Sequence, residues 1–199
     1  MTYKENPERE QDRFEDTFDH FKRFGFVLFP QNKRIYENLY KLIWGRSVLE
    51  AGCGQGTGTA ILSRATTANI IGTDKIEKNI KFAKELYSWI DFEVWDISKN
   101  PFRKKKDVVI CVEAIEHIKN YRQAIKNLIN SAKKEVWIST PNKLETENQP
   151  SNPFHVKEFT VKEMLEMIGN YKVKILHWDT FEVLDENTKV NPLVYYIKL

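Results

Sequence analysis

A short run of strand-forming residues leads directly into a glycine cluster, and no other feature of the sequence constrains the fold as much. Residues 47–51, SVLEA, are mostly apolar, and the sequence GCGQGTG follows at once. Glycine lets the backbone turn tightly and lets a ligand approach it closely. A helical pattern then continues to about Arg64, so this segment predicts a strand, a ligand-binding turn and a helix in succession.

Beyond this turn, short apolar runs alternate with helical segments. Further strands are expected at 69–73, 91–95, 107–112, 135–139, 173–183 and 193–199, and helices at 76–87, 120–131 and 160–168. The run DVVICV at 107–112 is apolar on both faces, which is typical of a central parallel strand. No helix separates the last two strands, so they should pair antiparallel. The pattern predicts an α/β fold with a seven-stranded, mostly parallel sheet, an antiparallel last strand and helices on both faces.

The first 45 residues have a helical pattern and precede the sheet. Apolar residues recur there with the spacing of one helix face, at Phe14, Phe18 and Phe21 and again at Ile35, Leu39 and Leu42. One interpretation is two helices that pack on the core, and another is a lid over a substrate pocket. A third is a helix on a membrane surface, because the apolar run 26–29 lies near Lys22 and Arg23.

Composition excludes several classes of protein. The net charge of +3 is too small to indicate a nucleic-acid partner by itself. We interpret the basic run 103–106 as a solvated turn, because it precedes a strand and lies at the amino end of the sheet. No stretch reaches the eighteen or so apolar residues of a membrane span, and the charged start lacks a signal-peptide core. Two cysteines without a zinc-site spacing fit a reducing compartment, so a cytoplasmic location is expected.

The glycine spacing and its acidic neighbour narrow the choice of ligand. A dinucleotide motif beginning at Gly52 or Gly54 would require glycine at 57 or 59, and both positions are threonine. No lysine follows the loop as it does in a phosphate-binding P-loop. Glu50 would also repel phosphates, whereas it suits a ligand with positive charge. S-adenosylmethionine fits this requirement, since it carries a sulfonium and an ammonium and has no phosphate.

The sequence VLEAGCGQGTG resembles the first motif of the class I S-adenosylmethionine-dependent methyltransferases, with Glu50 in place of the commoner aspartate. Later motifs follow in order, so the resemblance extends from about residue 46 to residue 199. It implies a Rossmann-like fold, with residues 1–45 as a helical lid or cap and 46–199 as the domain that binds S-adenosylmethionine.

The same resemblance implies a role for individual residues. Asp74 would accept hydrogen bonds from the ribose hydroxyls, although it could instead cap the helix that follows. Ile76 would cover the adenine, and Asp96 and the Ile97 amide would bind its edge, although Asp96 could also be a solvated turn residue. The complete set of expected cofactor-binding residues is Glu50, Gly52, Cys53, Gly54, Gly56, Asp74, Lys75, Ile76, Asp96, Ile97, Val112 and Glu113.

After the strand at 107–112 comes a second pattern, Glu-x-x-Glu-His, formed by Glu113, Glu116 and His117. It resembles the O-methyltransferases of ubiquinone biosynthesis and the small-RNA 2′-O-methyltransferases. His155 lies in a stretch that resembles a further motif of this family, just before the last helix. The resemblance implies that Glu113, Glu116, His117 and His155 hold a divalent cation such as Mg²⁺, with both glutamates on one face if the segment is helical.

The alternative without a metal makes His117 the general base, with Glu116 beside it, because the pKa of histidine lies near neutrality. In either case we predict methyl transfer to an oxygen of a small molecule. Two other interpretations stay open: RNA 2′-O-methylation, and a non-catalytic subunit that binds S-adenosylmethionine and activates a partner. Nucleic acid is not an expected partner, because extra basic surface is lacking, and the oligomeric state is open.

Overall fold

The computed structural model describes residues 30–65, 69–144, 152 and 154–199. The apolar pattern at Phe14, Phe18 and Phe21 and the run at 26–29 lie outside the described residues. None of the described helices is both long and apolar enough to cross a membrane.

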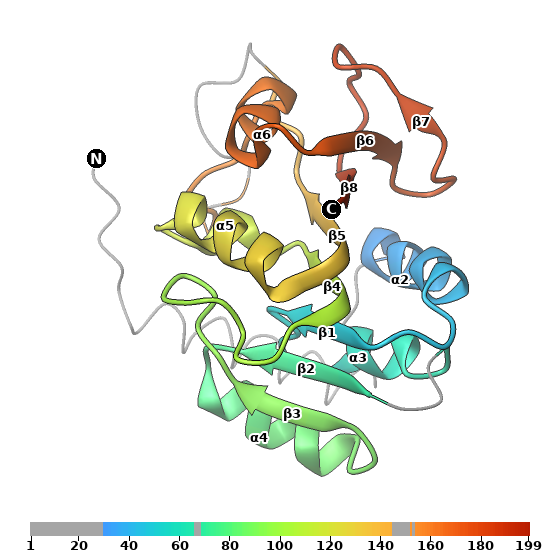
Figure 1. Ribbon diagram of the computed structural model, residues 1–199, viewed down its shortest axis with the longest axis vertical. Coiled ribbons are helices and arrows are strands. Elements are labelled where there is room, and N and C mark those ends of the chain that lie inside the picture. Colours follow the sequence, from blue (N-terminus) through green and yellow to red (C-terminus); the bar gives the residue numbers. More distant parts are fainter. Residues whose placement is uncertain (1–29, 66–68, 145–151, 153) are drawn as a thin grey trace.

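An eight-stranded sheet forms the centre of the described chain, with the strand order β3-β2-β1-β4-β5-β8-β6-β7 (Figure 1). The first five strands in this order are parallel, and β8 lies between β5 and β6 and runs antiparallel to both. The bounds are β1 Val48–Ala51, β2 Ile70–Asp74, β3 Asp91–Val94, β4 Lys106–Val112, β5 Ala132–Thr140, β6 Lys172–His177, β7 Val183–Leu184 and β8 Leu193–Lys198.

The structure confirms the mostly parallel α/β sheet and the antiparallel pairing at its carboxyl-terminal end. The predicted strand at 173–183 is wrong in one respect, because it divides into β6 and the short edge strand β7. The chain leaves the strand conformation after His177, and Phe181 adopts a left-handed φ of 58°. This break raises the number of strands from the predicted seven to eight.

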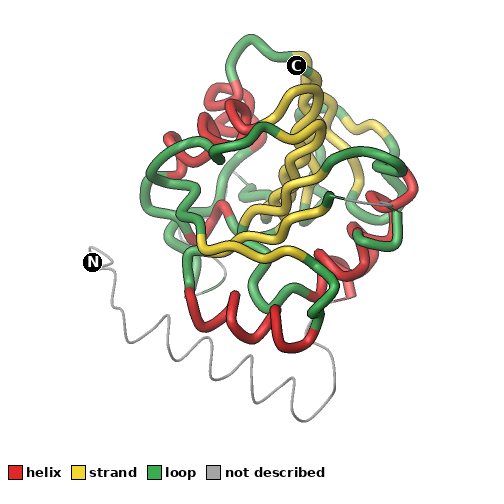
Figure 2. Tube along the Cα trace, turned by 60° about the horizontal axis from the view of Figure 1, so that its bottom comes forward, coloured by secondary structure: helices red, strands yellow, loops and turns green. Residues whose placement is uncertain are grey.

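Helices cover both faces of the sheet (Figure 2). The apolar residues of α2, α3 and α4 join one buried cluster with one face of the strands, and those of α5 and α6 join another cluster on the opposite face. The bounds are α2 Pro30–Leu42, α3 Thr57–Leu62, α4 Glu77–Leu86, α5 Tyr121–Ser131 and α6 Val161–Ile168. A capping box of Thr160 and Glu163 begins α6.

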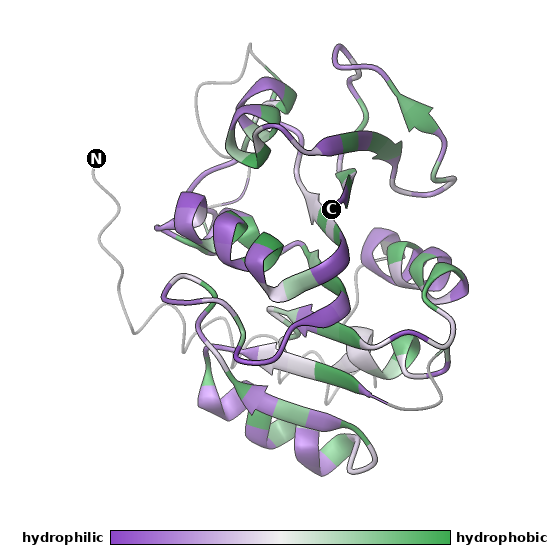
Figure 3. Cartoon of the chain, in the orientation of Figure 1, coloured by the Kyte–Doolittle hydropathy of each residue, from purple (hydrophilic) through white to green (hydrophobic). Residues whose placement is uncertain are grey.

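The central strand β4 contributes to both buried clusters because successive side chains point to opposite faces. Val109 and Cys111 pack on the face covered by α5, while Val108 and Ile110 pack on the other. Full burial of each aliphatic side chain stabilises the fold by about 1.5–3 kcal/mol. Figure 3 shows the corresponding pattern on α5, where hydrophobic and hydrophilic residues occupy different sides of the helix.

Helix α2 buries a stripe that differs slightly from the predicted one. Ile35 and Leu39 are fully buried, but Leu42 is 50% exposed and Ile43 takes its place in the core. The helix ends at Leu42, so this last residue of the predicted stripe lies where the chain leaves the helix. The described part of the predicted lid packs beside α3, and its role as a lid stays a prediction.

The basic run at 103–106 is only partly a solvated turn. Arg103 is exposed and pairs with Glu93, as expected for a surface turn. Lys106, by contrast, is the first residue of β4 and is only 3% exposed. Its Nζ donates a hydrogen bond of 2.7 Å to Asn69, and burial lowers its pKa. The interpretation of Lys106 as a solvated residue is therefore wrong, because the strand begins one position earlier than expected.

Candidate active site

The glycine loop connects β1 with α3 at the carboxyl end of the parallel strands. Gly52, Gly54 and Gly56 all have positive φ, which non-glycine residues adopt at a cost. A Cβ added at Gly52 would lie 2.6 Å from the Cβ of Ala114, in the segment after β4. The missing side chain therefore lets the glycine loop and the segment after β4 come into direct contact.

Asp74 ends β2 and organises this loop with both of its carboxylate oxygens. Gly54 N donates to Oδ2 at 3.0 Å, and Ile76 N donates to Oδ1 at 2.8 Å. Asn79 Nδ2 is a further donor to Oδ1, at 3.3 Å. Helix α4 begins only at Glu77 and has no side-chain cap, so Asp74 is not its N-cap. The carboxylate instead ties the second strand to the glycine loop.

A cavity of about 180 Å³ lies over these groups. Eight of the predicted cofactor-binding residues line it: Gly52, Gly54, Asp74, Lys75, Ile76, Asp96, Ile97 and Glu113. The predicted catalytic residue His117 lines it as well. Lining residues without a predicted role are Gln55, Asn79, Trp95, Ala114 and Ile118. Most of these flank a predicted residue directly, and Asn79 lies in the first turn of α4 and donates to Asp74.

Asp96 lies at the end of the cavity that Trp95 and Ile97 also line. Its Oδ1 accepts hydrogen bonds from the backbone and the hydroxyl of Ser98, at 2.9 and 2.6 Å. Burial tends to raise the pKa of this carboxyl, but the bonds from Ser98 outweigh that effect and lower it. Asp96 is therefore an ionised acceptor at the cavity, in keeping with its predicted contact to an adenine amino group.

Four other predicted cofactor residues, Glu50, Cys53, Gly56 and Val112, do not line the cavity. Glu50 is completely buried beneath the loop. Its two carboxylate oxygens accept hydrogen bonds from the hydroxyls of Tyr36 on α2 and Thr59 on α3. Glu50 therefore joins β1 to two helices, and the structure does not place it where it would meet a cationic ligand.

Changing Glu50 to glutamine is expected to raise the free energy of unfolding more at pH 8 than at pH 5. Burial raises the pKa of Glu50 to about 7, against the ordinary 4.5, although the bonds from Thr59 and Tyr36 oppose this effect. The folded protein thus binds this proton more tightly than the unfolded chain, and stability is lost as pH rises through that interval. Between pH 5 and pH 8, the free energy of unfolding of the variant should therefore rise by about 2–3 kcal/mol relative to that of the wild type.

Urea unfolding of both proteins at the two pH values measures this difference. Glutamine can keep both contacts, because the hydroxyls of Tyr36 and Thr59 can also accept hydrogen bonds. Glu166→Gln, on the exposed side of α6, is the matched control and should show no such movement. A stability difference independent of pH at Glu50 would contradict the elevated pKa.

Glu113 directly follows β4 and was predicted to be a metal ligand. The structure places it outside the cluster of possible ligands. Its φ of 49° is left-handed, and the helical turn begins only at Ile115. Its carboxylate accepts a hydrogen bond from Ser139. Burial, opposed by this bond and assisted by Glu158, raises its pKa to about 7. Glu113 and Glu116 therefore do not share a helical face, because the backbone reverses its twist between them.

The turn Ile115–His117 places His117 at the cavity. Its Nδ1 lies 2.9 Å from the carbonyl oxygen of Phe154. A carbonyl oxygen only accepts, so Nδ1 carries the proton and Nε2 of the neutral ring holds a lone pair. Nε2 lies 3.7 Å from Oε1 of Glu116, whose side chain is almost completely buried. The tautomer of His117 thus suits a proton acceptor or a metal ligand.

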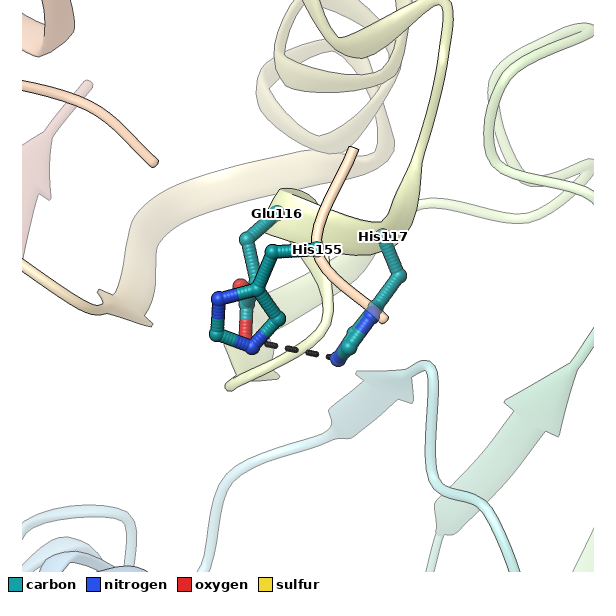
Figure 4. Close-up of side chains that lie close together, drawn as sticks. All are labelled: Glu116, His117 and His155. Atoms are coloured by element: carbon teal, nitrogen blue, oxygen red, sulfur yellow. Dashed lines mark ion pairs between the residues drawn. The ribbon is translucent and has the colours of Figure 1, made fainter. Parts of the chain in front are cut away.

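His155 approaches the same turn from a distant part of the sequence. Backbone N–H groups of Val156 and Lys157 donate to the Glu116 carbonyl oxygen, at 2.8 and 3.2 Å, and hold the two segments together. His155 Nδ1 lies 2.6 Å from Oε1 of Glu158, which leaves Nε2 as the ring nitrogen for a ligand. The His117 and His155 rings meet edge to face, with their ring centroids 4.8 Å apart (Figure 4).

Among the described residues, Glu116, His117 and His155 form a cluster of side chains that could bind a metal ion. One ligand atom from each lies within 4.8 Å of the others. A carboxylate and two imidazoles suit Mg²⁺, Mn²⁺ or Zn²⁺, and the limit of 4.8 Å on their separation is close to twice a metal–ligand bond of about 2.0–2.3 Å. The donors therefore fit a divalent cation. The cluster contains three of the four predicted ligands, and Glu113 is not among them.

A methyltransferase domain family matches the chain over residues 49–139. A protein of Mycolicibacterium smegmatis described as a probable S-adenosylmethionine-dependent methyltransferase is 27% identical over 146 residues, which are 70% of this chain and 56% of that protein. A ubiquinone biosynthesis O-methyltransferase of Rickettsia canadensis is 34% identical over 116 residues, which are 55% and 47% of the two chains. The chain spans about half the length of these curated relatives.

Solved structures of methyltransferases have a similar fold over almost the whole chain. A methyltransferase from Clostridium acetobutylicum that depends on S-adenosylmethionine has a TM-score of 0.69 at 13% identity, covering 95% of this chain and 98% of that one. The magnesium protoporphyrin IX methyltransferase of Synechocystis with bound S-adenosylhomocysteine has a TM-score of 0.68 at 17% identity, covering 97% and 99%. The chain thus matches a methyltransferase domain over residues 49–139 and has the fold of these S-adenosylmethionine-dependent methyltransferases.

Proposed function

We propose that the protein transfers a methyl group from S-adenosylmethionine to an oxygen atom of a small molecule. The observation that carries this proposal is the cluster of Glu116, His117 and His155 beside a cavity that also contains the glycine loop and Asp74. The cavity residues suit the methyl donor, and the cluster suits activation of a hydroxyl. The name of one relative, a ubiquinone biosynthesis O-methyltransferase, supports oxygen as the atom that is methylated.

The cavity offers complementary groups for the donor. Asp74 supplies carboxylate oxygens for two ribose hydroxyls, and Ile76 and Ile97 supply apolar surface for the adenine ring. The Asp96 carboxylate lies at the same end for the adenine amino group. When bound, S-adenosylmethionine supplies an activated methyl group on a sulfonium.

The protein's own contribution to the chemistry is mostly alignment and proton removal. As the carbon–oxygen bond forms, the carbon–sulfur bond breaks and its electron pair stays on sulfur. His117 Nε2, with its lone pair, accepts the hydroxyl proton in the form without a metal. Holding the acceptor in line with the methyl group can contribute about 7–11 kcal/mol in the best cases.

A divalent cation would give the cluster a different role. Glu116, His117 and His155 would then hold the ion, and the ion would lower the pKa of a bound hydroxyl. His117 cannot act as base and ligand in the same state, because both roles use the Nε2 lone pair. The hydrogen bond from His155 to Glu158 would orient that ring in either case.

A labelled-methyl transfer assay on cell extract tests the proposed activity. Purified protein and S-adenosylmethionine with a labelled methyl group are added, and label is counted in small-molecule, lipid, RNA and protein fractions. Label in the small-molecule or lipid fraction is expected. Label in RNA would favour 2′-O-methylation instead, and no label in any fraction would favour a subunit that binds the donor without catalysis.

A further inference from the structure

Exposed lysines gather at the edge of the sheet where the parallel strands begin, which is the edge opposite the cavity. β4, β5 and β6 begin at this edge, and β8 ends there because it runs antiparallel to β5 and β6. The exposed lysines in these strands or directly before them, which we call the basic edge, are Lys104, Lys105, Lys133, Lys134, Lys172, Lys174 and Lys198.

The pairing of the strands places several of these charges side by side. Lys172 of β6 and Lys198 of β8 are direct register partners. The backbone N–H of Leu199 donates to the Lys134 carbonyl oxygen at 2.9 Å, which joins the end of β8 to the start of β5. Like charges directly opposite each other destabilise a sheet. An anionic partner at this edge would therefore relieve a repulsion that the chain alone retains.

The lysines before β4 and at the start of β5 are also neighbours. Burial lowers the pKa of Lys106, and the charges of Lys104 and Lys133 lower it further, whereas Asp91 and Glu93 oppose them. Lys104 and Lys133 therefore both lie near Lys106. Because β4, β5, β8 and β6 are adjacent in the sheet, the basic edge extends across all four strands.

The acidic residues of β4 and β5 leave most of these lysines without an opposite charge. Glu135 pairs with Arg46 at 2.7 Å, and Asp107 lies 3.6 Å from Lys134. Within the described ranges, no ion pair involves the remaining lysines of the basic edge, which are Lys104, Lys105, Lys133, Lys172, Lys174 and Lys198. Their charges are available to an anionic partner.

Large apolar side chains are exposed at the same edge. Trp44 precedes β1 and is 66% exposed, and Trp89 precedes β3 and is 70% exposed. Tyr171 directly precedes β6, Leu199 directly follows β8, and both are exposed as well. The edge thus combines positive charge with aromatic and aliphatic side chains that contact water.

An anionic membrane surface fits this combination better than a protein or a nucleic acid does. Lysines beside exposed tryptophan and leucine are typical of proteins that lie on membranes. Protein interfaces are depleted in lysine, and base recognition relies mostly on arginine. The arginines of this edge, Arg46 and Arg103, already pair with Glu135 and Glu93. An RNA acceptor bound here would also lie far from the cavity.

We propose that the basic edge binds a membrane surface that contains anionic phospholipids, with the exposed aromatic side chains at the level of the headgroups. The cavity then faces away from the membrane, so the methyl acceptor reaches it from the aqueous side. This inference does not rest on the proposed function, because the basic edge and the cavity lie on opposite sides of the sheet.

Sedimentation with vesicles tests the inference. The full chain is mixed with vesicles of phosphatidylcholine alone or of phosphatidylcholine with phosphatidylserine. We expect binding only to the vesicles with phosphatidylserine, and a steep loss of binding as salt is raised, because salt screens the attraction. A triple variant, Lys133→Gln, Lys172→Gln and Lys198→Gln, should lower the partition coefficient at least about 30-fold, since each lysine contributes roughly three- to five-fold.

A second triple variant is the matched control, because it removes the same charge at the other edge. Lys119, Lys162 and Lys189 are exposed near the beginnings of α5, α6 and β8, where the parallel strands end. Changing all three to glutamine should lower the partition coefficient much less than the first triple variant does. Thermal unfolding shows whether both variants are folded.

Fluorescence identifies the face that meets the lipid. Brominated lipids quench tryptophans in contact with them, and Trp44 and Trp89 are the exposed tryptophans of the described residues. Vesicles with brominated phosphatidylcholine and phosphatidylserine should quench the wild type, and the double variant Trp44→Phe and Trp89→Phe should lose most of this quenching.

Three results would overturn the inference. One is the absence of binding to vesicles with phosphatidylserine, and another is an equal loss of binding in the two triple variants. The third is tighter binding to single-stranded RNA than to vesicles at the same phosphate concentration, which would assign the lysines to a nucleic acid. None of these results bears on methyl transfer, which the assay on cell extract tests separately.

Discussion

Asp74→Ala is expected to weaken the binding of S-adenosylhomocysteine at least a hundred-fold, which corresponds to about 3 kcal/mol. The change removes a charged acceptor for two ribose hydroxyls, and each such bond contributes about 1.5–3 kcal/mol. It also releases the N–H groups of Gly54 and Ile76, which Asp74 holds at 3.0 and 2.8 Å. The ligand would then have to order the glycine loop as well as bind to it.

Isothermal titration calorimetry measures the loss, and thermal unfolding without ligand shows whether the variant is folded. Asp74→Asn is the matched variant, because it keeps the shape and one acceptor oxygen while removing the charge. Its affinity should lie between those of Asp74→Ala and the wild type. Wild-type affinity in Asp74→Ala would contradict the assignment of Asp74 to the methyl donor.

Removal of divalent cations with EDTA is expected to abolish methyl transfer, with activity restored by added Mg²⁺ or Mn²⁺. The physical reason is the convergence of three donors, from Glu116, His117 and His155, within 4.8 Å. Their fixed orientation favours metal binding, because hydrogen bonds to the second ring nitrogen set the tautomer of each histidine. Turnover is measured before and after chelation, and metal content is measured by elemental analysis.

Two glutamate variants control this experiment. Glu116→Gln removes a predicted ligand and should lower the metal content, whereas Glu113→Gln changes a carboxylate outside the cluster and should leave it unchanged. Binding of S-adenosylhomocysteine should survive EDTA, which separates the donor from the metal. Full activity after chelation, in a protein without metal, would instead leave His117 as the general base.

The parts of the site that could be predicted are those whose chemistry is local. The glycine loop and Asp74 follow directly from the ends of two strands, and parallel strands bring their carboxyl ends to one edge of the sheet. The alternation of strands and helices likewise fixed most of the fold. The two-residue strand β7 was missed, because so short an edge strand has no periodicity of its own.

The parts that could not be predicted depend on contacts between distant residues. Glu50 has the position of a ligand-facing acid, but Tyr36 from α2 reaches its carboxylate below the loop. Glu113 has the right spacing for a shared helical face, and only its left-handed φ removes it from the cluster.

The contact between Gly52 and Ala114 limits how such an enzyme can change its choice of acceptor. A larger residue at either position would push the donor loop away from the turn that carries Glu116 and His117, because the space between them is already filled. Divergence or engineering at position 114 would therefore harm donor binding and chemistry together. Ile118 also lines the cavity but does not lie within 4 Å of a Cβ added at Gly52, so new acceptor specificities are better sought there.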